Sequence, residues 1–274
     1  APAGGGPALP LIASELPDSS PQYSPDGKHL AFVSLRSGSN GIWVAGADGA
    51  NEHLVFDGKG MPVGSESWSP DGKQLAFEWH PAANAEIHVV AAGGGKSRPV
   101  VADAFNNRVP VWSCDGSYLY FSTNRTGRPE IFRVAESGGP VTQITTSGVP
   151  YARVGPDCNQ LYYMTGGKPG AETRELWRAD MRDGLLGAPQ LVLPQLWPQD
   201  WNNWVAEASG LYFMHRQKGQ DPAIQYLDFQ THKVRTVHDL QRPTAWGGGM
   251  AIAPDSKALL FTQVDRDGTS LFVQ

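Results

Sequence analysis

The stretch Tyr23-Ser24-Pro25-Asp26-Gly27-Lys28, followed by Leu30-Ala31-Phe32, recurs along the 274-residue chain. Close copies begin at Trp68 and Trp112, and more divergent copies begin at Val154, Trp204 and Ile252. The aromatic residue that closes each copy recurs every 42 to 50 residues, at Phe32, Phe77, Phe121, Tyr163, Phe213 and Phe261. Repeats of about 40 to 50 residues with strand-like content are typical of propeller blades. The chain is therefore predicted to be an all-β, six-bladed β-propeller.

Each repeat is expected to fold into one blade of four antiparallel strands. Proline at the second turn position, with Asp-Gly after it, suits a tight β-turn between the first two strands. The Leu-Ala-Phe segment is apolar throughout, as expected of a strand buried between neighbouring blades. The third segment of each repeat, such as Gly41-Ile42-Trp43-Val44, alternates like a half-buried strand.

The ends of the chain predict how the ring closes. Five repeats contain a candidate fourth strand, whereas the sixth stops at Gln274. Residues 7–14 supply an unassigned strand before the first repeat, and we expect it to complete the last blade and so remove an exposed sheet edge. The prediction is one propeller domain over 1–274, with a linker over 1–6 and blades starting near residues 18, 64, 107, 150, 201 and 247.

Composition and charge exclude several classes of function. The net charge is −5 and the sequence pI is about 5.8, whereas a nucleic-acid-binding domain usually has a basic face and a high pI. No apolar stretch approaches 18 residues, so the domain is not expected to enter a membrane. The N-terminal residues do not show the pattern of a signal peptide. We expect a domain cut from a larger protein that binds no nucleic acid.

The two cysteines, Cys114 and Cys158, fall in matching turns of neighbouring repeats. A disulfide requires Cα atoms within about 7 Å of each other, and the repeat register places these turns in separate blades. The sequence therefore predicts two unpaired thiols and leaves the redox compartment open.

Motifs for catalysis and for cofactors are missing from the sequence. A serine hydrolase of the α/β type needs Gly-x-Ser-x-Gly, and the chain contains none. The seven histidines show no helical zinc spacing, and Gly247-Gly248-Gly249 precedes a strand rather than a helix, which disfavours dinucleotide binding. Asp26 and its equivalents are expected to cap their own turns. We expect no catalytic residue, no metal and no cofactor.

A ligand site is predicted on one face of the ring. The loops that enter each blade and those between its second and third strands are expected on the same face, and they are rich in tryptophan and arginine. These types are enriched at binding hot spots, and arginine can grip a carboxylate. We expect a peptide, a protein segment or an acidic small molecule there, although tryptophans could instead plug the channel. The candidate ligand-binding residues are Arg36, Glu66, Arg108, Arg125, Tyr151, Arg153, Trp201, Asn203, Arg216 and Trp246.

The repeat resembles that of TolB-like propellers, and it is similar to propeller repeats of prolyl-oligopeptidase-type enzymes. The last two repeats, including Leu211-Tyr212-Phe213 and Leu260-Phe261-Thr262, resemble C-terminal propellers of bacterial membrane-anchored winged-helix regulators. These resemblances imply an extracytoplasmic, periplasmic location and a non-catalytic sensor or interaction domain. Two alternatives remain: a protein-interaction scaffold of the TolB kind, and an enzyme module. The latter would be a gating propeller without its peptidase, or a lyase or cyclase with a metal in the funnel.

Overall fold

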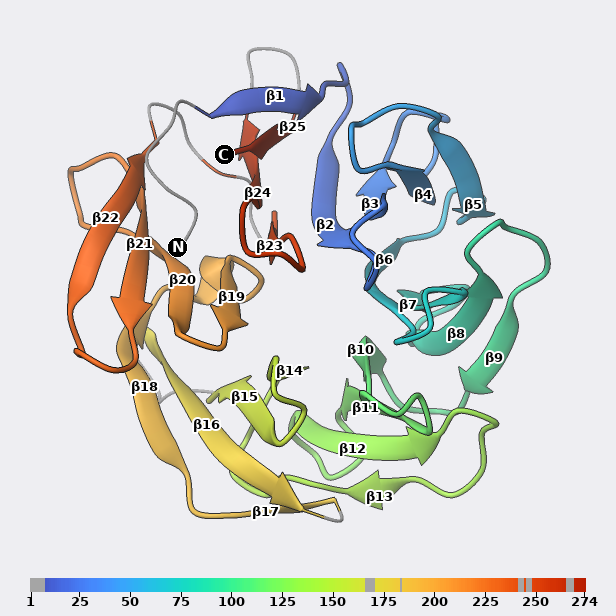
Figure 1. The fold of residues 1–274 in the computed structure, drawn as a ribbon. Coiled ribbons are helices and arrows are strands. Elements are labelled where there is room, and N and C mark those ends of the chain that lie inside the picture. Colours follow the sequence, from blue (N-terminus) through green and yellow to red (C-terminus); the bar gives the residue numbers. More distant parts are fainter. Residues whose placement is uncertain (1–7, 166–170, 183, 241–243, 245–247, 265–268) are drawn as a thin grey trace.

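Six sheets surround a central axis in the computed structural model of this chain (Figure 1); among the described residues, five of them have four strands and one has five. The structure describes residues 8–165, 171–182, 184–240, 244, 248–264 and 269–274. Every sheet is antiparallel, and the one helical segment in this part of the chain is the short 3-10 helix η1 (Pro198–Asp200). The predicted six-bladed, all-β propeller is confirmed.

The first three blades have the same order of strands from the axis outward. Blade 1 consists of β2 (Asp18–Tyr23), β3 (His29–Ser34), β4 (Gly41–Gly46) and β5 (His53–Asp57). Blade 2 consists of β6 (Val63–Trp68), β7 (Gln74–Trp79), β8 (Glu86–Ala91) and β9 (Arg98–Val101). Blade 3 consists of β10 (Asn107–Trp112), β11 (Tyr118–Thr123), β12 (Glu130–Ala135) and β13 (Thr142–Gln143).

The second half of the ring is less regular. Blade 4 consists of β14 (Tyr151–Val154), β15 (Gln160–Met164), β16 (Arg174–Arg182), β17 (Leu185–Leu186) and β18 (Gln190–Leu196). Blade 5 consists of β19 (Trp204–Glu207), β20 (Gly210–His215), β21 (Ala223–Asp228) and β22 (Val234–Asp239). Blade 6 consists of β23 (Met250–Ile252), β24 (Leu259–Val264), β25 (Thr269–Val273) and β1 (Leu9–Ile12). The predicted start of the sixth blade near residue 247 lies outside the described residues.

The two ends of the chain close the ring, as predicted. Strand β1 pairs antiparallel with β25, with Leu9 opposite Val273 and Pro10 opposite Phe272. Figure 1 shows β1 lying along the outer side of blade 6. Strand β1 therefore completes the sheet formed by β23, β24 and β25, and it covers the outer edge of β25.

The core lies between the blades. Trp68, Trp112 and Trp204 of the inner strands are buried in three separate clusters, each of which joins two neighbouring blades. The indole Nε1 of Trp68 donates to the carbonyl of Gln22, 3.3 Å away, and that of Trp112 donates to the carbonyl of Ser67, 3.1 Å away. The inner-strand tryptophans are thus packed between blades.

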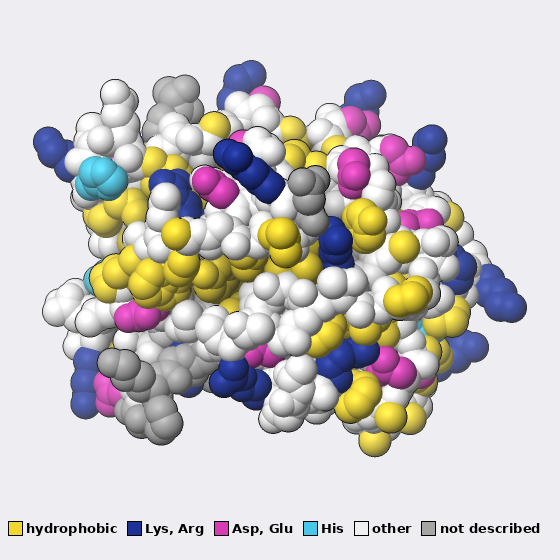
Figure 2. All heavy atoms as spheres, turned by 90° about the horizontal axis from the view of Figure 1, so that it is seen from below, with side chains coloured by type: hydrophobic (Ala, Val, Ile, Leu, Met, Phe, Trp, Pro, Cys, Tyr) yellow, Lys and Arg dark blue, Asp and Glu magenta, His cyan; other side chains and the backbone are white. Residues whose placement is uncertain are grey.

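Blade 4 carries two exposed hydrophobic side chains on its outer strands. Leu185 of β17 is 75% exposed and Leu191 of β18 is 49% exposed. Figure 2 views the ring from the lower edge of Figure 1, and hydrophobic side chains form a band there on the side where β18 lies. The β16–β17 hairpin reaches blade 3, because a Cβ on Gly184 would collide with the guanidinium of Arg133.

The Asp-Gly turns are built by side-chain hydrogen bonds. In blade 1, the Ser24 hydroxyl donates to Asp26 Oδ1 at 2.6 Å, and the same oxygen accepts the Lys28 backbone N–H at 3.1 Å. Asp71 and Asp115 make both of these bonds, and Asp157 and Asp255 accept the equivalent backbone N–H, from Asn159 and Lys257. The recurring aspartates therefore cap their own turns, as predicted from the sequence.

These turns also touch one another around the ring. A Cβ on Gly27 would lie 3.4 Å from Pro254, and one on Gly116 would lie 3.4 Å from Pro70. The turn glycine of each of these blades therefore packs against the turn proline of the preceding blade. Both glycines have φ near +70°, a left-handed conformation that glycine adopts without strain.

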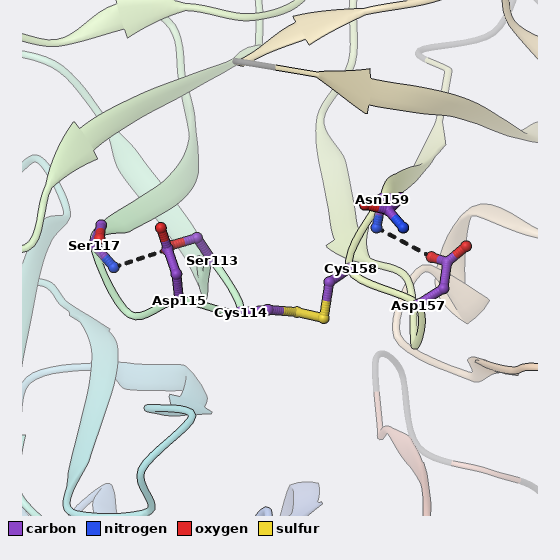
Figure 3. The surroundings of a disulfide bond; sticks show 7 residues. All are labelled: Ser113, Cys114, Asp115, Ser117, Asp157, Cys158 and Asn159. Carbon is purple, nitrogen blue, oxygen red and sulfur yellow. Dashed lines mark hydrogen bonds between the residues drawn. A yellow bond between two sulfur atoms is a disulfide. The ribbon is translucent and has the colours of Figure 1, made fainter.

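Between blades 3 and 4 this contact is replaced by a disulfide. Cys114 occupies the proline position of its turn, and Cys158 occupies the glycine position of the next turn with φ +64°. Their Cα atoms lie 5.8 Å apart and their sulfur atoms are bonded (Figure 3). The prediction of two unpaired thiols is wrong, because ring geometry brings the turns of neighbouring blades into contact.

Replacing both cysteines by alanine is expected to lower the free energy of unfolding by about 2–4 kcal/mol, because the disulfide closes a loop of 44 residues. The double variant Cys114→Pro/Cys158→Gly should keep more stability, since it restores the contact found at other blade junctions. Urea unfolding followed by circular dichroism measures both. Equal midpoints for the oxidised and reduced wild type would contradict this role of the disulfide.

Candidate ligand-binding channel

The inner strands of all six blades enclose a cavity of about 220 Å³, which we call the channel cavity. A neighbouring hollow of about 300 Å³, the outer hollow, is lined by residues of blades 1 to 5. The two volumes share five lining residues: Ser20, Ser65, Val109, Tyr151 and Trp201. They therefore adjoin each other along a path that follows the axis of the ring.

Three inner strands carry the same backbone irregularity where they line this path. Ser20, Ser65 and Val109 have φ values of +55°, +52° and +51°, and the pairing of each strand with the next shifts register at that point. A β-branched residue such as Val109 rarely adopts this conformation. Bulges of this kind redirect backbone groups and side chains, and they are frequent beside functional sites.

Glu66 of β6 lines the channel cavity and is fully buried. Neither carboxylate oxygen accepts a hydrogen bond from another described residue. Burial raises the pKa of Glu66 from 4.5 to about 8; the backbone N–H of Glu66 itself and the guanidinium of Arg153 oppose the rise, and the carboxylate of Glu78 adds to it. At neutral pH Glu66 is therefore mainly the neutral acid.

Arg153 of β14 reaches from blade 4 to the two following blades. Its guanidinium donates to the Asn202 side-chain oxygen and lies 3.4 Å from the Asn202 carbonyl and 3.5 Å from the Met250 carbonyl. It also lies 5.3 Å from the ring centre of Trp204. Burial lowers the pKa of Arg153 to about 10, so the group stays charged at neutral pH and is held by acceptors of the protein itself.

At the outer hollow, Glu78 connects blade 2 to blade 3. It accepts the Val109 backbone N–H at 2.8 Å, lies 3.3 Å from His80 Nε2 and lies 3.5 Å from Arg108 Nε. Burial favours a raised pKa for Glu78, but its bonds to His80 and Val109 and the charge of Arg108 outweigh burial and hold the pKa below its usual range. The Arg108 side chain is 51% exposed, which leaves it accessible at the entrance.

Tyr151 and Trp201 form an aromatic wall along the same path. Their ring centres lie 4.6 Å apart with the planes inclined by 21°, a stacked pair. Both residues line the channel cavity and the outer hollow. Trp201 therefore stands at the side of the path and leaves the channel cavity open beside it.

The remaining predicted arginines are engaged at the rim by acids or amides of their own blades. Arg36 pairs with buried Asp18 at 3.0 Å. Arg216 makes two bonds of 2.6 and 2.8 Å to the fully buried carboxylate of Asp200. The partners of Arg125 are Asp103, at 2.9 Å, and Asn107, at 3.2 Å.

Asn203 is likewise held inside the protein. It donates to Asp200 Oδ1 at 2.8 Å and accepts the Gly249 backbone N–H at 2.8 Å. Trp246 lies outside the described residues. Of the ten predicted residues, the structure brings five to the channel: Glu66, Arg108, Tyr151, Arg153 and Trp201.

The sequence prediction missed Glu78 and the three bulged positions. A signal for Glu78 exists, because it follows the anchor aromatic Phe77, where the other repeats have Val33, Ser122, Met164, Met214 and Thr262. An acid in this buried strand needs a buried partner, and the neighbouring blade supplies one. The bulges left no comparable signal, because serine and valine are ordinary strand residues.

A second hollow, of about 480 Å³, lies on blade 4 and is lined by apolar side chains that include Tyr163, Trp177, Pro189 and Pro194. In the described part of the chain, no three or more His, Cys, Asp or Glu side chains form a group able to hold a metal ion. None of the described helical segments has the length and apolar character needed to cross a membrane.

Comparison with known families gives one match that covers most of the chain. The family described as TolB beta propeller domain matches residues 4–182. The Tol-Pal system protein TolB of Hydrogenovibrio crunogenus is 40% identical over 52 residues, which are 19% of this chain and 12% of that protein.

Solved structures share the architecture at low sequence identity. TolB from Acinetobacter baumannii matches with a TM-score of 0.66 and 18% identity, over 96% of this chain and 65% of that one. A gluconolactonase from Xanthomonas campestris matches with a TM-score of 0.70 and 14% identity, over 99% and 90%. An oligogalacturonate lyase from Vibrio parahaemolyticus matches with a TM-score of 0.62 and 12% identity, over 97% and 92%.

At these identities the structural likenesses show the fold alone. The chain spans less than two thirds of the length of the TolB chain from Acinetobacter baumannii, and its match to the Hydrogenovibrio protein covers a smaller share still.

Glu66→Gln is expected to change how stability depends on pH. The folded state binds the Glu66 proton more tightly than the unfolded state does between pH 4.5 and about 8. The wild type should therefore lose about 1.4 kcal/mol per pH unit relative to the variant as pH rises through this window. The two proteins should unfold alike below pH 4.5, and the variant should be the more stable at pH 8.5. Parallel pH dependence in urea unfolding would contradict a buried, unpaired carboxyl.

Arg216→Met and Arg108→Met should differ in their effect on stability. Loss of Arg216 strands the buried charge of Asp200, which is expected to cost about 3–5 kcal/mol. Loss of the half-exposed Arg108 should cost about 1 kcal/mol or less, because Glu78 keeps its bonds to His80 and Val109. Urea unfolding of both variants tests the contrast, and equal losses would show that the two arginines do not differ in role.

Proposed function

The chain belongs to the TolB β-propeller domain family, and on this premise we propose that it is a non-catalytic interaction domain that binds a peptide or protein segment along its central channel. The observation that carries the proposal is that the outer hollow and the channel cavity adjoin each other along the axis of the ring and share five lining residues. Arg108 stands exposed at its entrance, and Tyr151 and Trp201 form its wall.

The chemistry of this path suits a chain segment. A half-exposed guanidinium can bind a carboxylate through paired hydrogen bonds, and a stacked aromatic pair offers apolar area at low entropic cost. Drug-sized ligands usually occupy pockets of about 300–1,000 Å³, whereas each volume here is at or below that range. Two small volumes in series fit successive side chains of an extended segment better than one bulky ligand.

The absence of catalysis is part of the proposal. Glu78 and Arg153 are bound to other groups of the protein, so neither is free to act on a substrate. Glu66 has no neighbouring nucleophile of the Gly-x-Ser-x-Gly kind in the sequence.

The cellular setting is proposed from two observations. Disulfides persist mainly in oxidising compartments such as the periplasm, and Cys114 and Cys158 form one. One relative is named as a Tol-Pal system protein. We propose an extracytoplasmic, periplasmic domain that acts as one component of a multi-protein system, either as a scaffold or as the sensor part of a larger regulator.

Selection of peptides from a random display library on the purified domain tests the proposed function. Enriched peptides should carry an acidic residue and an apolar or aromatic residue. Their affinity should fall at least tenfold in Trp201→Ala and in Arg108→Met, because truncation of a central hot-spot residue typically has this effect.

Trp177→Ala is the matched control, since it removes the same side chain from the hollow on blade 4. It should leave peptide affinity unchanged. Peptides that bind Trp201→Ala as tightly as the wild type, or that lose affinity only in Trp177→Ala, would move the interaction away from the channel and overturn the proposal.

A further inference from the structure

We propose that the channel cavity is a subsite for a single primary ammonium group, and that the carboxyl group of Glu66 accepts it. This inference rests on the proposed function, because the ammonium would belong to the segment bound along the channel. A lysine side chain and a chain N-terminus both carry this group, and the experiment below separates the two sources.

The first argument is the missing partner of Glu66. The great majority of buried polar groups in proteins have a hydrogen-bond partner, and each exception calls for an explanation. Glu66 is fully buried, yet neither of its oxygens accepts a bond from another described residue. Glu66 is also one of the residues that line the channel cavity, so we infer that the missing donor comes from a ligand bound there.

The second argument is that the neighbouring charges are already engaged. Arg153, the basic group whose charge acts on Glu66, forms no ion pair with it and is bound to Asn202. Glu78, the other acid within electrostatic range, is bound to Arg108, His80 and Val109. Among the acids near this cavity, Glu66 is therefore the one whose carboxyl is left for an incoming donor.

The third argument is size and lining. A cavity of about 220 Å³ lies below the usual range for a whole small-molecule ligand, so it suits one side chain or one chain end. Val109, Tyr151, Trp204 and Ala251 give it apolar walls. Aliphatic stems pack on such walls while their charged tip finds a polar partner, and aromatic faces attract a cation.

An ammonium fits this single carboxyl better than a metal ion does. It is a compact charge with three donors, whereas calcium takes six to eight oxygen ligands. Arginine is the poorer match, because its planar guanidinium needs a partner on each edge. One primary ammonium would supply both the hydrogen-bond donor and the neighbouring positive charge that the carboxyl of Glu66 lacks.

Binding should be linked to the protonation of Glu66. The pKa of Glu66 is raised to about 8 by burial, opposed by Arg153 of β14 and reinforced by Glu78 of β7. An ammonium favours the ionised carboxylate, so binding below pH 8 releases a proton. Affinity should therefore rise between pH 6 and pH 9 in the wild type and stay level in Glu66→Gln.

Three matched amides test the subsite. N-acetyl-lysine amide carries only a side-chain ammonium, norleucine amide carries only an N-terminal one, and N-acetyl-norleucine amide carries none. Binding at pH 7 is followed by two-dimensional NMR of the 15N-labelled domain, at the Glu66 backbone amide and the Trp201 indole N–H. A pH series uses N-acetyl-lysine amide, whose ammonium stays charged throughout.

At least one ammonium-bearing amide should bind at least tenfold more tightly than N-acetyl-norleucine amide, as expected for a hydrogen-bonded charge pair. The one that does identifies the source. Glu66→Gln should remove this preference and the pH dependence. Glu66→Asp, which keeps the charge on a shorter stem, should retain the preference at lower affinity.

Equal binding of all three amides, no binding up to 50 mM (roughly the weakest fragment affinity worth measuring), or an undiminished preference in Glu66→Gln would overturn the subsite. The proposed function is judged separately. Display-selected peptides that lose affinity in Trp201→Ala but not in Glu66→Gln would leave channel binding standing and remove the ammonium subsite alone.

Discussion

Burial between neighbouring blades is the constraint on which the rest of the structure depends. Each blade has an apolar second strand, such as Leu30-Ala31-Phe32, which cannot be buried within a single four-stranded sheet. Repeats of this kind bury their apolar faces only by stacking on the next repeat. In a ring the stacking must also close, and the pairing of β1 with β25 completes the blade through which blades 5 and 1 are joined.

Closure of the ring sets the chemistry at its centre. The inner strands converge there, so groups from different blades come within reach of one another. Arg153 of blade 4 meets Asn202 of blade 5, and Glu78 of blade 2 meets Val109 of blade 3. At the rim, Arg36 and Arg216 are used inside their own blades to neutralise buried aspartates. Most charged side chains around the channel thus stabilise the ring. The channel site is formed by the few that have no such role.

Closure of the ring also brings together the Asp-Gly turns, which join the first and second strands of each blade. At three junctions between blades, the glycine of one turn packs against the proline of the preceding turn, as Gly27 does against Pro254, Gly72 against Pro25 and Gly116 against Pro70. Cys114 and Cys158 replace one such proline and one such glycine, and the distance that accommodates the first pair also accommodates a disulfide. The bond therefore strengthens a contact that the architecture already provides, at the junction that the β16–β17 hairpin also spans.

The number of blades, their four-strand pattern, the closing strand and the turn-capping role of Asp26 and its equivalents were determined by the sequence alone. These features depend on apolar residues that recur from repeat to repeat and on hydrogen bonds that span a few residues. Both can be recognised in the sequence. Tertiary structure decided that Cys114 bonds to Cys158 and that Arg36, Arg125 and Arg216 pair with carboxylates of the protein. It also decided that the carboxyl of Glu66 accepts no hydrogen bond from another described residue. Each of these outcomes depends on distances between strands that are far apart in the chain, and those distances are set by the closure of the ring and by bulges at Ser20, Ser65 and Val109, which no local pattern encodes.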